Sequence, residues 1–247
     1  MAWSVHLRAG EGALDAIKKA GLLKVAVPQD FPPFGSIGTD LKPIGYDIDT
    51  AQLIADSLGV GLELVPVTST NRVPYLTTGK ADLIISSLGK NPDREKVIDF
   101  SSAYAPFYSG VFGPVDAVLG APADLVGKTV AVTRGSVEDL ELAKMIPAGV
   151  DVRRFEDNSS TISAYLTGQS QFVATGNIVA ATINEHDPAK ELEPKFMIKD
   201  SPCYVGLNKN QPELLAAVNS AIAQAKRDGR LEAIAKKWLR ISLPPGL

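Results

Sequence analysis

The sequence predicts an α/β protein built from two similar lobes. Helical and strand-like patterns alternate along the chain, and this alternation occurs twice with a similar layout. With 247 residues, of which 45% are hydrophobic, the chain can bury a substantial core. Two lobes of about 100 residues each fit this length better than a single sheet of about ten strands or more.

The first run of elements occupies the first hundred residues. Its helices have one apolar face and end near glycine, and its strands are short apolar stretches. In chain order, the run contains a helix over 13–21, a strand over 22–28, a helix over 46–59, a strand over 62–67, a helix-like stretch over 71–79 and a strand over 81–87. This βαβαβ order predicts a mostly parallel sheet.

A second run with a similar layout follows the stretch "YAPFYSGVFGP". It contains strands over 128–133, 151–155 and 171–175 and helices over 136–146, 159–168 and 177–185. Two final helices, over 212–229 and 230–239, are expected to complete the first lobe. We therefore expect residues 1–109 and 201–247 to form lobe 1 and residues 110–200 to form lobe 2.

Charge and composition exclude several classes of function. The net charge is -3 and both signs are interspersed, so no surface for nucleic acid or an anionic membrane is expected. The single cysteine, Cys203, excludes an internal disulfide and is interpreted as a small buried residue. His6 and His186 lie in polar stretches and are interpreted as surface residues. Neither a metal nor a cofactor is predicted, and the expected partner is a small molecule.

The start of the chain, "MAWSVHLRAGEG", lacks the apolar core of a signal peptide, and no apolar run is long enough to span a membrane. We expect a mature exported protein whose signal peptide has been removed. These residues alone are equally compatible with a cytosolic origin.

Ligands of open parallel sheets bind outside the carboxyl ends of the strands, so the residues after each strand form the candidate site. After the first strand, prolines stiffen a loop that presents Phe31 and Phe34. Phe31 is predicted to form an aromatic wall, whereas Phe34 is interpreted as core. After the second strand, Arg72 starts a helix, where a cation opposes the helix dipole unless an anion lies near it. Arg72 is therefore either an anion-binding or a solvated residue.

After the third strand, Ser86, Ser87 and Gly89 offer hydroxyls, backbone N–H groups and room for a ligand to approach the chain. Arg94 follows, and its guanidinium can pair with a carboxylate through two hydrogen bonds. The alternative for Arg94 is an ion pair with an acidic neighbour in the sequence.

In the second run, Ser136 is the natural N-cap of its helix, and the free N–H groups of a helix start can bind a carboxylate. Glu138 and Asp139 in the first turn are interpreted as compensating the helix dipole rather than as catalytic.

Five segments in this order resemble the polar amino-acid-binding proteins of ABC transporters, known as solute-binding protein family 3. They are "LLKVAVPQDFPPFG", "GYDIDTAQLIADSLG", "TSTNRVPYLTTGKADLIISSLGKNPDREKVIDFS", "GKTVAVTRGS" and "GRLEAIAKKWL". Within that family, "TSTNRVPYL" and "KKWLRISLPPGL" most resemble the glutamate/aspartate-binding branch. The resemblance implies a type II periplasmic binding protein that acts as a monomer. Its two lobes are expected to be joined by two crossing segments and to close on one ligand, and a membrane permease is expected to recognise the closed form.

The resemblance also implies roles for single residues. Arg72, together with Ser69, is expected to meet the side-chain carboxylate of the ligand, and Arg94 is expected to clamp its α-carboxylate. Phe31 is expected to pack on the aliphatic part of the ligand. The other implied contacts come from Ser86, Ser87, Gly89, Thr133, Ser136, Val137, Asn158 and Asn177.

Two positions depart from the family pattern. Gly89 stands where a hydroxyl residue is usual, and Gly176 and Asn177 stand where the carboxylate that receives the α-ammonium is usual. A buried ammonium without a carboxylate partner is costly. Either the ligand lacks an amine, as a dicarboxylate or keto acid does, or one of four residues substitutes: Asn177, Asn158, Asp157 or Glu138.

The sequence therefore predicts a binding protein of an ABC importer, without enzymatic activity, for an acidic or polar amino acid or another carboxylate-bearing solute. Two alternatives use the same fold. A cyclohexadienyl dehydratase needs a carboxylic acid in the cleft, for which only Glu138 is available. A receptor ectodomain would need a membrane span or a signalling domain elsewhere in the gene.

Overall fold

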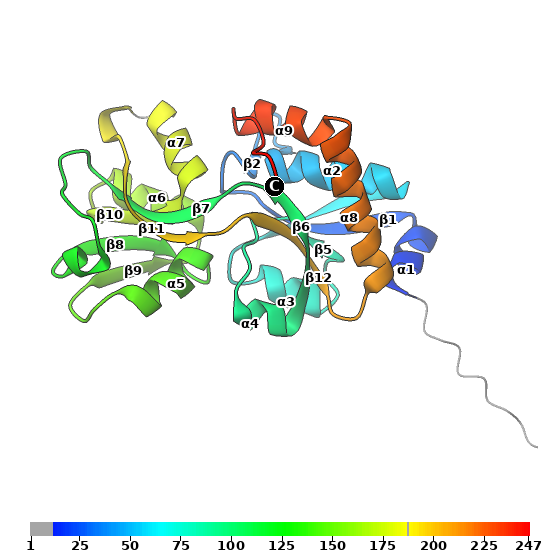
Figure 1. Ribbon diagram of the computed structural model, residues 1–247, viewed down its shortest axis with the longest axis horizontal. Helices are drawn as coiled ribbons and strands as arrows, with labels where there is room; N and C mark the ends of the chain where they lie inside the picture. Colours follow the sequence, from blue (N-terminus) through cyan, green and yellow to red (C-terminus); the bar gives the residue numbers. More distant parts are fainter. Residues whose placement is uncertain (1–11, 187) are drawn as a thin grey trace, which may run out of the picture.

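The computed structural model describes residues 12–186 and 188–247 of the chain. Its helices and strands form two lobes, each with a five-stranded sheet flanked by helices (Figure 1). Lobe 1 contains the early and late parts of the chain, and lobe 2 contains the middle part. The predictions for the first residues of the chain, His6 included, lie outside the described residues.

The sheet of lobe 1 has the strand order β4-β1-β5-β12-β6. Its strands are β1 (Leu22–Pro28), β4 (Gly61–Val67), β5 (Leu83–Ile84), β6 (Ile98–Ala105) and β12 (Cys203–Asn208). β1 runs parallel to β4 and β5, whereas β12 runs antiparallel to β5 and β6.

Six helices and a short hairpin complete lobe 1. They are α1 (Ala13–Ala20), α2 (Tyr46–Leu58), α3 (Arg72–Thr77), α4 (Pro92–Val97), α8 (Pro212–Arg227), α9 (Arg230–Trp238) and the strands β2 (Ser36–Ile37) and β3 (Pro43–Ile44). α1 and α2 end where Gly21 and Gly59 take the left-handed conformation, as the sequence predicts. The helices α2, α8 and α9 contact one another, as Figure 1 shows, and bury a common apolar core.

The sheet of lobe 2 has the order β11-β7-β10-β8-β9. Its strands are β7 (Tyr108–Gly113), β8 (Thr129–Thr133), β9 (Asp151–Phe155), β10 (Phe172–Gly176) and β11 (Glu193–Asp200), and its α-helices are α5 (Val137–Met145), α6 (Asn158–Leu166) and α7 (Asn177–His186). Two short 3-10 helices lie over Pro122–Leu125 and Pro188–Lys190.

The chain crosses between the lobes twice. It leaves the first sheet at Ala105 and enters the second at Tyr108, and it returns between Asp200 and Cys203. In each sheet the crossing strands run antiparallel to their neighbours, while β8, β9 and β10 of lobe 2 are parallel. Both sheets are therefore mixed: in each of them four strands run in one direction, in agreement with the predicted mostly parallel sheets, and one crossing strand, β12 or β7, runs in the other.

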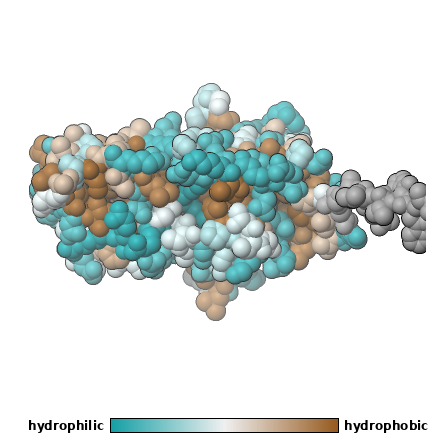
Figure 2. Space-filling view, turned by 90° about the horizontal axis from the view of Figure 1, so that it is seen from below, coloured by the Kyte–Doolittle hydropathy of each residue, from teal (hydrophilic) through white to brown (hydrophobic). Residues whose placement is uncertain are grey.

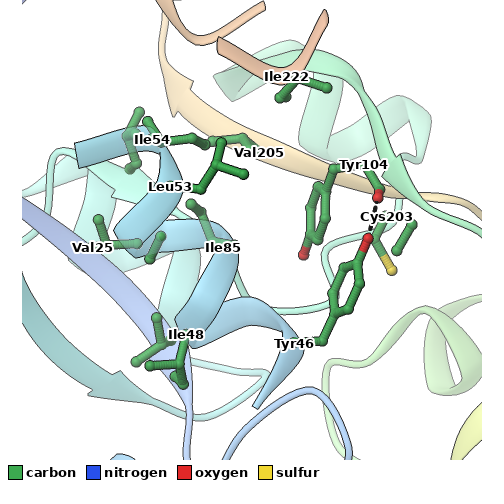
Figure 3. Close-up of a cluster of buried hydrophobic side chains, with 14 of the residues drawn as sticks. Val25, Tyr46, Ile48, Leu53, Ile54, Ile85, Tyr104, Cys203, Val205 and Ile222 are labelled. Carbon is green, nitrogen blue, oxygen red and sulfur yellow. Dashed lines mark hydrogen bonds between the residues drawn. The ribbon is translucent and has the colours of Figure 1, made fainter. Parts of the chain in front are cut away.

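The core of lobe 1 lies between the sheet and the helix α2. Figure 3 shows Tyr46 and Tyr104 stacked beside Cys203, with the Tyr46 hydroxyl donating to the Tyr104 carbonyl at 2.5 Å. Cys203 is buried and Phe34 is fully buried, which confirms both interpretations. His186 is exposed, as expected.

The surface carries no large continuous apolar area in the view from below, where hydrophilic residues cover much of the middle of the molecule (Figure 2). Among the helices of residues 12–186 and 188–247, none combines the length and apolar character required to cross a membrane.

Candidate functional site

A cavity lies between the lobes, at the carboxyl ends of β1, β4 and β5 and at the starts of α5 and α6. Its volume is only about 20 Å³, which is room for little more than one water molecule, so the lobes must move apart to admit a solute. Its wall is formed by Pro28, Phe31, Val67, Thr68, Ser69, Arg72, Ser86, Ser87, Phe107, Ser136, Val137, Glu138, Asn158 and Ser201. Eight of the predicted site residues lie on this wall: Phe31, Ser69, Arg72, Ser86, Ser87, Ser136, Val137 and Asn158.

Arg72 is a buried cation on the cavity wall. It is only 4% exposed, so it is not the solvated residue that the sequence left as an alternative. Its Nη1 donates to the Ser86 carbonyl at 2.5 Å, and its Nε has no hydrogen-bond partner in the described part of the chain. Burial lowers the pKa of the guanidinium below its ordinary value. A guanidinium with an unused buried donor is prepared to receive an anion.

The turn at Ser86 and Ser87 is held in place by Asp47, a residue that the sequence analysis did not single out. Ser87 has a φ of 42°, which is unusual for a residue with a side chain, and its N–H donates to Asp47 Oδ2 at 2.7 Å. The Tyr104 hydroxyl donates to Asp47 Oδ1 at 2.7 Å. Burial raises the pKa of Asp47 to about 7. Asp47 thereby positions the serines that face the cavity.

Arg94 lies beside the cavity and does not form part of its wall. Its Nη1 donates to the Gly89 carbonyl at 2.8 Å in lobe 1, and its Nη2 donates to the Gly135 carbonyl at 3.0 Å in lobe 2. Burial, followed by the charge of Arg72, lowers the pKa of Arg94 to about 9, so it stays protonated at neutral pH. The guanidinium has five N–H groups, and these two hydrogen bonds use two of them.

Ser201 explains the glycine at position 89. A side-chain Cβ at Gly89 would lie 2.2 Å from the Ser201 hydroxyl oxygen, so that hydroxyl occupies the space. Ser201 comes from the second crossing between the lobes, is buried and lies on the cavity wall. The hydroxyl that is missing at Gly89 is therefore supplied from a distant part of the chain.

Phe107 explains the glycine at position 176 in the same way. A Cβ at Gly176 would lie 1.9 Å from Cζ of the Phe107 ring. Phe107 lies on the cavity wall and packs against Phe31 and Phe34, with ring centroids 6.5 Å and 5.5 Å away. No side chain can therefore enter the cavity from position 176 while the Phe107 ring is in place.

Lobe 2 contributes the start of α5. The Ser136 hydroxyl accepts a hydrogen bond from the Asp139 N–H at 3.1 Å, which confirms that Ser136 is the N-cap. Glu138, interpreted from sequence as compensating the helix dipole, lies on the cavity wall, and its Oε1 accepts a hydrogen bond from the Ser109 hydroxyl at 2.8 Å. The cavity therefore contains a carboxylate as well as a guanidinium.

Asn158 links the two lobes at the start of α6. Its N–H and its Nδ2 donate to the Asp30 carboxylate of lobe 1 at 2.7 Å and 3.2 Å, and the Ser159 N–H lies 3.4 Å from the same group. Its Oδ1 accepts a hydrogen bond from the Thr133 hydroxyl at 2.9 Å, so both ends of the amide are engaged. The two lobes are in contact across the cavity.

Gly89, Arg94, Thr133 and Asn177 are the predicted site residues that do not line the cavity. The Asn177 Oδ1 accepts a hydrogen bond from the Tyr108 N–H at 3.0 Å and so supports the first crossing. Asp157, a candidate substitute for the missing carboxylate, caps α6 by accepting from the Ser160 N–H at 2.7 Å. Contact of these residues with a ligand remains a prediction.

The sequence analysis did not predict that three residues line the cavity: Phe107, Ser201 and Glu138. The two unusual glycines were the available signal, because a missing side chain indicates that another group fills its place. Within residues 12–186 and 188–247, no cluster of three or more potential metal ligands occurs.

Comparisons with known proteins agree with this architecture. The model of the family "bacterial extracellular solute-binding proteins, family 3" matches residues 23–241. The L-cystine-binding protein TcyJ of Escherichia coli strain K12 is 30% identical over 241 residues, which cover 95% of this chain and 89% of that protein. A glutamate/aspartate import solute-binding protein of Salmonella typhimurium is 25% identical, with 96% of this chain and 82% of that protein covered.

Among solved structures, a mutant of ArgBP from T. maritima has a TM-score of 0.85 and 30% sequence identity, and the match covers 93% of this chain and 100% of that chain. The names of these relatives refer to different amino acids, so the comparisons do not single out the glutamate/aspartate branch. Family model, relatives and structure agree on one grouping: the chain belongs to the bacterial extracellular solute-binding proteins, family 3.

Proposed function

We propose that this protein is the substrate-binding component of an ABC importer and that it captures an acidic amino acid outside the cytoplasmic membrane. The family and the named relatives support a role in solute uptake. The cavity between two lobes joined by two crossings supports capture by closure. A membrane permease is the expected partner, and the protein is expected to act as a monomer.

The observation that carries the choice of ligand is the buried Arg72. Its unpartnered Nε lies in a wall that also contains the hydroxyls of Ser69, Ser86 and Ser87. Hydroxyl and guanidinium donors together suit a carboxylate, and a charge-assisted hydrogen bond would relieve the cost of burying the cation. Arg94, which lies beside the cavity, is the natural partner for a second carboxylate.

The balance of charge at the cavity favours an acidic amino acid over a basic amino acid or a dicarboxylate. Two guanidinium groups, Arg72 on the cavity wall and Arg94 beside it, stand against one carboxylate on the wall, Glu138, so these three groups together carry one excess positive charge. An amino acid with an acidic side chain carries one net negative charge and neutralises the site. A basic amino acid would add a second uncompensated positive charge, which is costly in a buried site. A dicarboxylate would leave one excess negative charge.

The position of Glu138 on the cavity wall also favours testing one enzymatic alternative. A dehydratase acting on prephenate or arogenate needs a carboxyl group in the cavity, and Glu138 is such a group. Product formation that disappears in Glu138→Ala would replace the binding function with this activity.

A thermal-shift screen tests the proposal. It compares L-glutamate and L-aspartate with L-glutamine, L-arginine, L-cystine, glutarate and succinate. A ligand at about 100 times its dissociation constant stabilises the protein by about 2.7 kcal/mol, which raises Tm by several degrees. We expect the two acidic amino acids to give the largest shifts. Larger shifts with L-arginine or L-cystine would contradict the proposed ligand, and the absence of any shift would contradict binding of these solutes altogether.

A further inference from the structure

The cavity wall contains a carboxylate, Glu138, and the proposed function does not yet say which group of the ligand it contacts. Glu138 is 7% exposed and is the only acidic residue among the described residues that line the cavity. It lies in the first turn of α5, and the hydroxyl of Ser109 from β7 donates to its Oε1 at 2.8 Å. An element of lobe 2 and a crossing strand therefore hold this carboxylate in one orientation.

Glu138 acts on both arginines without being paired with either. Within the described residues, its carboxylate forms no ion pair of 4.0 Å or less with Arg72 or Arg94. Burial lowers the pKa of both guanidinium groups, and the negative charge of Glu138 partly offsets this effect. The carboxylate is thus close enough to act on both cations and is not committed to an ion pair with either of them.

The other candidates for an ammonium acceptor either lie off the cavity wall, as Asp157 and Asn177 do, or bridge other groups, as Asn158 does. Asp157 caps α6, the Asn158 amide bridges Asp30 and Thr133, and the Asn177 oxygen accepts from the backbone of β7. The Phe107 ring closes the route from position 176, because any Cβ there would overlap it. Glu138 is therefore the carboxylate that remains available on the wall.

We propose that Glu138 accepts the ammonium group of the bound amino acid and makes the site select amino acids over acids that lack the amine. The assignment rests on the proposed function and names the group that completes it. The arginines receive the carboxylates of the ligand, and Glu138, on the opposite lobe from Arg72, receives its ammonium.

Calorimetric titration with L-glutamate and glutarate tests the assignment, because these ligands differ only in the amine. Wild-type protein is expected to bind L-glutamate more tightly. Glu138→Gln keeps the size of the side chain and an acceptor for Ser109 but removes the charge, and it should weaken L-glutamate binding by about 30-fold or more. Its affinity for glutarate should be unchanged or higher.

Glu141→Gln is the matched control. Glu141 lies one turn further along α5, its charge also raises the pKa of Arg94 against the effect of burial, and it is not part of the cavity wall. The control variant should therefore change both affinities by a similar small factor.

Three results overturn the assignment. An equal loss of both ligands in Glu138→Gln would show a general electrostatic role for Glu138. Tighter binding of glutarate than of L-glutamate by wild-type protein would retain an anionic ligand but remove the role of the ammonium. Failure of wild-type protein to bind either acid would contradict the proposed function itself. Wild-type protein alone gives this result, so it can be distinguished from a failure of the role assigned to Glu138.

Discussion

Asp30 is predicted to hold the two lobes together around the ligand. It lies in the loop after β1 of lobe 1, and its carboxylate accepts hydrogen bonds from Asn158 N and Asn158 Nδ2 at 2.7 Å and 3.2 Å. A third donor, the Ser159 N–H, lies 3.4 Å away. These groups form the start of α6, where the helix dipole favours a negative charge. The contacts join different lobes and therefore exist only when the lobes are closed.

The contribution of Asp30 to the stability of the closed form can be estimated from these contacts. A hydrogen bond to a charged group contributes about 1.5–3 kcal/mol, and the helix dipole adds about 0.3–1 kcal/mol at a partly exposed site. Solvent competes at Asp30, which is only partly buried, so the closed form should gain about 2 kcal/mol in total. Because ligand binding requires closure, Asp30→Ala should raise Kd by roughly 30-fold.

Calorimetry with the best ligand of the screen measures this effect, and Asp40→Ala is the control. Asp40 is an exposed carboxylate in the same lobe that accepts a hydrogen bond only from nearby Lys42. The control should change Kd by less than about twofold, since surface substitutions of this kind have small effects. A loss in Asp30→Ala no larger than that in Asp40→Ala would refute the role of Asp30 in closure.

Two further predictions concern stability. Gly176→Ala would place a Cβ 1.9 Å from Phe107 Cζ, so it should cost about 1–3 kcal/mol and lower Tm by several degrees. The same substitution should have much less effect when it is added to Phe107→Ala, because the ring is then absent. An unchanged Tm in scanning calorimetry of Gly176→Ala would show that the ring moves freely. Burial raises the pKa of Asp47 from 3.8 to about 7, so its contribution is fully present below pH 4 and is lost as the pH rises to about 7, by up to about 4 kcal/mol. The free energy of unfolding by urea should therefore fall over this range in wild type relative to Asp47→Asn, and parallel curves would contradict the shift.

Local chemistry allowed much of the fold to be predicted. Gly21 and Gly59 end helices because they adopt the left-handed conformation easily, and Ser136 caps α5 because its hydroxyl accepts a free N–H. The resemblance predicted two crossings between the lobes, but not which strands form them or how these strands pair within each sheet. Their pairing joins residues far apart in the chain, such as Tyr204 with Ala103, and no short pattern specifies such a partner.

The same distinction applies to the site. Residues after the strands, such as Arg72 and Ser86, could be predicted to lie on the cavity wall because strand ends converge at one edge of a sheet. Phe107 and Ser201 could not, because they lie on the crossings and reach the cavity only through the arrangement of the two lobes. Arg94 was expected on the wall, and it instead bonds to a carbonyl of each lobe beside it.

The most direct test of the proposed ligand is a calorimetric comparison of L-glutamate with L-arginine in wild-type protein and in Arg72→Ala. Arg134→Ala is the control, because Arg134 is exposed and pairs with Glu156 on the surface. We predict that wild-type protein binds L-glutamate about 100-fold more tightly than L-arginine, and that only Arg72→Ala loses this preference, since it removes a buried partner of the side-chain carboxylate. Tighter binding of L-arginine by wild-type protein, or an unchanged preference in Arg72→Ala, would contradict an acidic amino acid as the ligand.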